Sequence, residues 1–227
     1  MLDIKKGQYS TEYVIIIGIG VGIIASFLVY VTFFYGSFAS SSSASQITTA
    51  ANNLAKEVNY VASQGPGSMQ TFPITIPLLQ SQYSFFCGNL IKLQTTTELG
   101  VSKPAQNVSG MLPLSGGTFD AFARNENGSV LIGLDFSVAL IKQSYSISSS
   151  TLFYILSFYN SSNYLTGTAF NISIFSTGGV YLTSVTGSTG SGQVSGSLPF
   201  SFNPAKEYVV EVYPSGAGDY SSTCITG

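Results

Sequence analysis

A long run without charge near the N-terminus constrains this chain more than any other feature. No charged residue occurs between Glu12 and Lys56, and the densest apolar part is 13–38. As a helix, this part is about 39 Å long, which exceeds the roughly 30 Å hydrocarbon core of a bilayer. The sequence therefore predicts one membrane-spanning helix.

The residues that flank the run predict its orientation. Lys5 and Lys6 precede it, so the positive-inside bias places residues 1–7 in the cytoplasm and the C-terminal bulk outside. A cleaved secretory signal peptide is the competing interpretation. It fits less well, because the run is too long for such a segment and 37–39 (SFA) is a poor small-x-small cleavage site.

Small residues mark one region of the expected span. Gly18 and Gly22 form a G-x-x-x-G pair, which permits close approach between helices in a membrane or a dry bundle. The alternative is that glycine is simply common in membrane spans. Gly18 and Gly22 are therefore candidate assembly positions.

The residues before the run carry a resemblance to a known family. The stretch 5–13 (KKGQYSTEY), followed by an apolar run, resembles the class III signal peptide of archaeal type IV pilins. That resemblance implies cleavage by a prepilin peptidase between Gly7 and Gln8, on the cytoplasmic side. Glu12 then occupies the place of the glutamate typical of type IV pilins.

The carboxylate of Glu12 lies at the edge of an apolar segment, where an unpaired charge is unfavourable. In a dry helix bundle an unpaired carboxylate costs several kcal/mol, and the new α-amine of a neighbouring subunit would offset much of that cost. Glu12 would then set the register of each incoming subunit. The alternatives are that Glu12 only reaches the membrane interface, or that cyclisation of Gln8 removes the amine.

Helical periodicity resumes after a small-residue segment at 39–45. The apolar positions Ile47, Ala51, Leu54, Val58 and Val61 are spaced four and three apart, as in a coiled-coil stripe. The glycines and proline of 63–68 (SQGPGS) end the pattern. We predict a helix over 8–64, with 8–38 as its membrane-spanning and assembly part.

The remainder reads as β-structure in two regions. In the first, 65–134, strands are expected at 71–79, 89–95, 119–125 and 129–135, with a hairpin at Asn127-Gly128. Segments here, such as "VSGMLPLSGG", are similar to the head region of archaeal class III signal peptide proteins. In the second, 135–227, seven strands suggest an immunoglobulin-like sandwich, at 136–141, 151–159, 169–175, 179–185, 193–202, 207–213 and 221–225. The loop at 186–196 is expected to be a flexible hairpin loop.

Composition argues against several classes of function. Only 8% of residues are charged and the net charge is −2, without a basic patch, so no nucleic-acid partner is expected. The chain has no histidine, hence no imidazole base or ligand, and no Trp for sugar platforms. Its carboxylates are scattered. We expect no enzyme activity, cofactor or metal site.

The cysteines and the Asn-x-Ser sequons are candidate disulfide and glycosylation sites if the chain is exported. Cys87 and Cys224 are candidates for a disulfide outside the cell, or for two buried thiols. If the chain is exported, Asn-x-Ser sequons offer candidate N-glycosylation sites at Asn107, Asn127, Asn160 and Asn171.

Together these features predict an α+β chain, with a long N-terminal hydrophobic helix and an all-β head. The resemblance implies a structural subunit of a type IV pilus-like filament that serves adhesion. Its expected partners are copies of itself or related pilins, the prepilin peptidase, the assembly machinery and, as precursor, the cell membrane. The alternative is a surface binding protein, such as an adhesin, minor pilin or solute-binding module, anchored or exported by the same signal.

Overall fold

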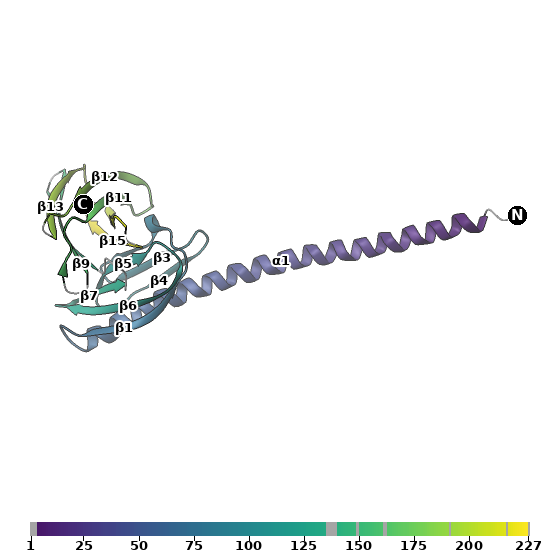
Figure 1. The fold of residues 1–227 in the computed structure, drawn as a ribbon, viewed down its shortest axis with the longest axis horizontal. Helices are drawn as coiled ribbons and strands as arrows, with labels where there is room; N and C mark the ends of the chain where they lie inside the picture. The colour runs from purple at the N-terminus through teal and green to yellow at the C-terminus, as the bar shows by residue number, and fades with distance from the viewer. Residues whose placement is uncertain are drawn as a thin grey trace. The chain divides into compact units, whose positions relative to one another are not determined.

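The computed structural model describes residues 4–134, 140–148, 150–160, 163–190, 192–216 and 218–226 (Figure 1). It has the expected N-terminal apolar helix followed by a mostly β head. The chain divides into two compact units, the first ending at Ser43 and the second spanning Ala44–Gly227. Helix α1 (Ile4–Ser63) belongs to both.

The predicted end of α1 is confirmed. The helix ends at Ser63, and Gly65 and Gly67 then adopt φ values of 93° and 85°, which favour glycine. Ser68 donates its hydroxyl to the carbonyl of Val61 at 2.7 Å, which also accepts a hydrogen bond from the backbone N–H of Gln64, so this carbonyl of the last turn is bound. At the other end, the chain is already helical from Ile4, not only from residue 8.

The predicted apolar stripe of the second helix half is also confirmed. Ile47, Ala51, Leu54, Val58 and Val61 are each at most 1% exposed. They form one core cluster with apolar side chains of the sheet, among them Ile74, Val108, Val130 and Ile132. This helix segment is therefore held by burial against the head.

Most of the head is one large sheet. The order of its main strands is β1-β6-β7-β5-β15-β14-β11-β12. A branch leaves this order at β15, where β2 pairs with β15, β3 pairs with β2, and β4 pairs with β3. The strands are β1 (Met69–Ile76), β2 (Phe85–Cys87), β3 (Leu90–Gln94), β4 (Leu99–Ser102), β5 (Asn107–Pro113), β6 (Gly117–Glu126), β7 (Ser129–Leu134), β11 (Ala169–Ser176), β12 (Tyr181–Ser188), β14 (Glu207–Pro214) and β15 (Asp219–Thr226).

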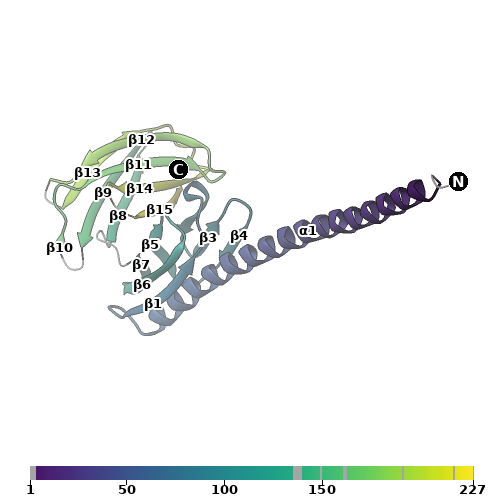
Figure 2. The ribbon, with the colours of Figure 1, turned by 45° about the vertical axis from the view of Figure 1, so that its right-hand side comes forward.

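A second sheet lies over the C-terminal part of the first (Figure 2). It consists of β8 (Leu140–Ser148), β9 (Thr151–Asn160), β10 (Asn163–Tyr164) and β13 (Gln193–Pro199). Between the sheets, side chains such as Leu156, Phe158, Ile172 and Val210 form a second core cluster. Two faces packed through one core make a β-sandwich, as expected for this region.

The expected division at 134/135 is not a division between compact units. Residues on both sides belong to one unit, and β15 lies between β5 and β14 in one sheet. Strand β5 explains why the sequence did not predict a single sheet across residue 134. Leu112 belongs to the core under the helix and Met111 to the core between the sheets, so both faces of β5 are buried. A strand buried on both faces shows no alternation of polar and apolar residues.

Gly110 gives β5 its close fit. Its φ is 142°, and a Cβ atom there would lie 2.0 Å from the backbone oxygen of Ile132 on the neighbouring β7. Glycine and proline within "NVSGMLP" also read as breaks in a strand pattern. Strand β4 is a further strand that the sequence did not predict.

The other expected strands are found at or near the predicted positions. Of the expected strand 136–141, residues 136–139 lie outside the described part, and β8 begins at Leu140. The Asn127-Gly128 hairpin is confirmed, because Glu126 pairs with Ser129 and both turn residues have positive φ. Residues 186–196, however, lead from β12 in one sheet to β13 in the other, so they do not close a hairpin.

The fit between α1 and β4 is tight enough to test. A Cβ atom on Gly100 would lie 2.6 Å from the backbone oxygen of Ile47, so Gly100→Ala must displace β4 or the helix segment. We expect a loss of about 2 kcal/mol in the free energy of unfolding. Gly190→Ala is the control, since no atom lies within 4 Å of its Cβ position. Urea denaturation of both variants measures the difference, and equal stabilities would contradict the close fit.

Candidate functional site

The first candidate surface is the apolar part of α1. Residues Tyr13–Tyr35 have a mean hydropathy of 2.7 and are long and apolar enough to cross a membrane. Their exposed large side chains range from 49% exposed at Ile17 to 75% at Phe33. Such a segment is compatible with a membrane anchor or a signal sequence. In water, so much exposed apolar surface is strongly unfavourable.

The hydroxyl groups of Ser26 and Thr32 within this segment are satisfied locally. Ser26 donates its hydroxyl to the carbonyl of Gly22 at 2.8 Å, and Thr32 donates to the carbonyl of Val29 at 2.8 Å. Gly18 and Gly22 have no atom within 4 Å of their Cβ positions, which leaves both backbones open to close approach. Gly7, Gln8 and Glu12 lie on α1, but their side chains fall outside the described part.

The two cysteines, whose state the sequence left open, form a disulfide. Cys87 of β2 and Cys224 of β15 are bonded, with Cα atoms 4.9 Å apart. The bond joins the two regions that the sequence separated. The parallel pairing of β2 with β15, at Phe86 and Thr223, brings the two cysteines side by side. That pairing could not be read from the sequence.

The four sequons differ in accessibility. Asn107 begins β5 and Asn127 lies in the β6–β7 turn, and both are exposed. Asn160 ends β9, but its side chain is outside the described part. Asn171 lies within β11, between β12 and β14, and its amide oxygen is buried without a hydrogen-bond partner. Asn107 and Asn127 are therefore the more accessible acceptors.

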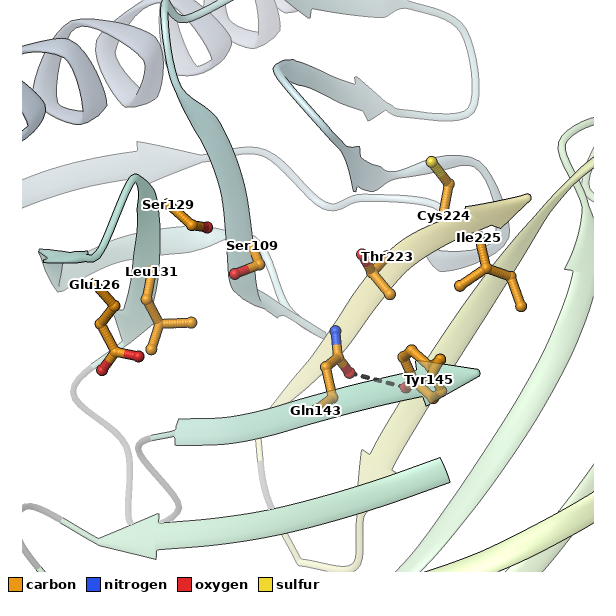
Figure 3. A pocket seen from close by; sticks show the side chains of 9 residues that line it. All are labelled: Ser109, Glu126, Ser129, Leu131, Gln143, Tyr145, Thr223, Cys224 and Ile225. Carbon is orange, nitrogen blue, oxygen red and sulfur yellow. Dashed lines mark hydrogen bonds between the residues drawn. The ribbon is translucent and has the colours of Figure 1, made fainter. Parts of the chain in front are cut away.

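A cleft of about 310 Å³ opens in the head (Figure 3). It lies between the β5–β7 part of the large sheet, strand β8 and strand β15. The lining residues are Ser109, Glu126, Ser129, Leu131, Gln143, Tyr145, Thr223, Cys224 and Ile225. The sequence predicted no ligand site among them, because residues of β5–β7, β8 and the distant β15 come together only in the folded head.

Two buried acids, Glu211 on β14 and Asp219 on β15, lie outside the cleft. Glu211 is fully buried, and the hydroxyl of Tyr213 donates a hydrogen bond to its Oε2 atom. Burial raises the pKa of Glu211 to about 7, although the bond from Tyr213 opposes this change. Tyr213 stacks on Tyr220, with ring centroids 5.4 Å apart. Burial, followed by the nearby Glu211 charge, raises the pKa of Tyr220.

Asp219 is the second buried acid. It is fully buried, and neither carboxyl oxygen has a hydrogen-bond partner. Burial raises its pKa to about 7. The glutamate within the apolar strand "YVVEVY" was a signal for Glu211 in the sequence, whereas nothing distinguished Asp219. Among the described residues, no three or more His, Cys, Asp or Glu side chains are placed to hold a metal ion together.

Comparison with known proteins identifies no family. No family model and no curated protein matches the chain. A solved structure from Bacteroides uniformis, named as a "putative carbohydrate binding protein", aligns with 72% of this chain and 100% of its own. The identity is 12% and the TM-score is 0.32, so the likeness carries no argument about fold or function.

Proposed function

We propose that this protein is a structural subunit of a type IV pilus-like surface filament. The observation that carries the proposal is the division of α1 into two kinds of surface. The stripe of the second half is buried in the head, whereas Tyr13–Tyr35 exposes apolar side chains. A polymer of such chains would bury the exposed segments against one another, and lipid would cover them before assembly.

The head suits an exterior surface in this proposal. It is poor in charge, rich in hydroxyl side chains, closed by a disulfide and carries two exposed sequons. Disulfides persist in oxidising compartments, which agrees with a head outside the cell. The resemblance of residues 5–13 supports processing between Gly7 and Gln8, with Glu12 near the new N-terminus.

The proposal predicts that Glu12→Ala is processed normally but assembles no filaments. The variant removes the carboxylate that would pair with a neighbour's N-terminal amine and so would lose the register of assembly. Cells are sheared, and the released fraction is examined by electron microscopy and by N-terminal mass spectrometry. Wild type should dominate the sheared fraction with a mature N-terminus at Gln8.

Glu57→Ala is the matched control. Glu57 lies on the same helix but off the buried stripe, so this variant should form filaments like wild type. The mass spectrum also shows whether Gln8 retains its free amine. Normal filaments from Glu12→Ala would contradict the pairing role. Wild type found only as single membrane-bound copies would contradict the filament proposal and favour an anchored binding protein.

A further inference from the structure

The cleft lies on the sheet face opposite to the buried helix segment. On β5 and β7, Val108, Val130 and Ile132 belong to the core that contains the helix stripe. Ser109 and Leu131 are cross-strand partners, and they occupy the alternate positions that line the cleft. Successive side chains of a strand point to opposite faces. One face of β5 and β7 therefore packs against the helix, and the other face lines the cleft.

The lining offers hydrogen bonds and contains only one charged side chain. Ser109, Ser129 and Thr223 contribute hydroxyls, and Leu131 and Ile225 contribute apolar surface. Its one acid, Glu126, is paired with Arg124, with Nε and Oε1 3.5 Å apart. No Lys or Arg side chain is among the lining residues, which disfavours anionic ligands. The pairing of Glu126 in turn weakens the attraction for cations.

Gln143 is held in one orientation by its neighbour. The hydroxyl of Tyr145 donates to Oε1 of Gln143 at 2.9 Å, and the Tyr145 side chain packs against the core between the sheets. In Figure 3 the amide nitrogen of Gln143 points toward the side chains of Ser109 and Thr223. A positioned amide beside hydroxyls and aliphatic groups suits a ligand with both hydroxyls and C–H faces.

We propose that this cleft binds one neutral sugar residue. A volume of about 310 Å³ is at the low end for small-molecule sites, which limits the ligand to about one ring. Two sources fit the same chemistry. Asn107 pairs with Ser129 across the strands, and Asn127 follows Glu126, so a glycan on either sequon begins beside the cleft. The other source is a saccharide from outside the chain.

The test uses the full chain in detergent, produced in a host without N-glycosylation. Saturation-transfer NMR measures binding of methyl glycosides of glucose, galactose, mannose and N-acetylglucosamine. We expect at least one of them to bind to wild type with a Kd of about 1 mM, as is typical of so small a ligand. Gln143→Ala should weaken that binding about tenfold, because it removes the positioned amide.

Two variants separate binding from folding. Gln193→Ala is the matched control, since Gln193 is exposed on the same sheet and outside the cleft, and it should bind like wild type. Tyr145→Phe keeps the packed ring but releases Gln143, so it should weaken binding without lowering the melting temperature by more than a few degrees. The proposal is overturned if no glycoside binds to wild type at about 10 mM, or if Gln143→Ala and Tyr145→Phe both bind like wild type.

The source of the sugar is distinguished with chain from native cells. If the chain's own glycan fills the cleft, native protein will not bind the free glycoside, and Asn107→Gln with Asn127→Gln will restore binding. If the saccharide comes from outside, native protein will bind as the unglycosylated chain does. The proposal does not depend on the filament proposal, since it concerns the head alone.

Discussion

Replacing both cysteines, Cys87→Ser with Cys224→Ser, should lower the free energy of unfolding of the head by about 5 kcal/mol. The disulfide closes a loop across a sequence separation of 137 residues. In the chain-entropy account, a cross-link over so long a loop removes many conformations of the unfolded chain and stabilises the fold by about this amount. Guanidinium denaturation of wild type and of the double variant measures the difference.

Chemical reduction of the disulfide in wild type provides the control for this prediction. Cys87 and Cys224 are both partly exposed, so a reductant can reach the bond. Reduced wild type should match the double variant, and the reductant should not change the double variant further. Equal stability of oxidised wild type and the double variant would contradict a stabilising role for the bond.

The head should be more stable at pH 5 than at pH 8 because of Glu211 and Asp219. The pKa of each lies at about 7 in the folded head, against ordinary values of 4.5 and 3.8. Between about pH 4 and pH 7 the folded head therefore binds more protons than the unfolded chain, so the free energy of unfolding falls as the pH rises. A pKa difference of this size corresponds to about 3 to 4 kcal/mol for each group.

Neutral substitutions test which groups are responsible. Glu211→Gln and Asp219→Asn should each flatten the dependence of the melting temperature on pH between 5 and 8, since neither amide ionises. Glu207→Gln is the matched control, because Glu207 is exposed on the same strand as Glu211. A wild-type head that becomes more stable from pH 5 to pH 8 would contradict the raised pKa values of the two acids.

The sequence predicted those parts of the structure that depend on patterns within a few neighbouring residues. The stripe Ile47–Val61 and the Asn127-Gly128 turn follow from spacing and turn chemistry within a few residues, and both were predicted. Strand β5 was missed because its burial on both faces and the close approach at Gly110 depend on strands elsewhere in the chain.

The candidate sites show the same limit. The apolar span is continuous in sequence and was predicted, whereas the cleft is assembled from separate strands and was not. The disulfide is intermediate, since its two cysteines were obvious candidates but their pairing needed the parallel contact of β2 with β15. Asp219 gave no signal, because its burial depends on the pairing of β15 with the distant strand β5, which places it opposite Pro113.

The position of β15 inside the sheet has a consequence for the timing of folding during synthesis. This strand bonds to β14, β5 and β2, yet it emerges more than a hundred residues after β5. The apolar span can therefore enter a membrane while the two halves of the large sheet are still unjoined. A chain interrupted before Asp219 would keep the edge of β5 open and Cys87 without its partner, so incomplete copies would present a reactive thiol and an unpaired strand to quality-control proteases.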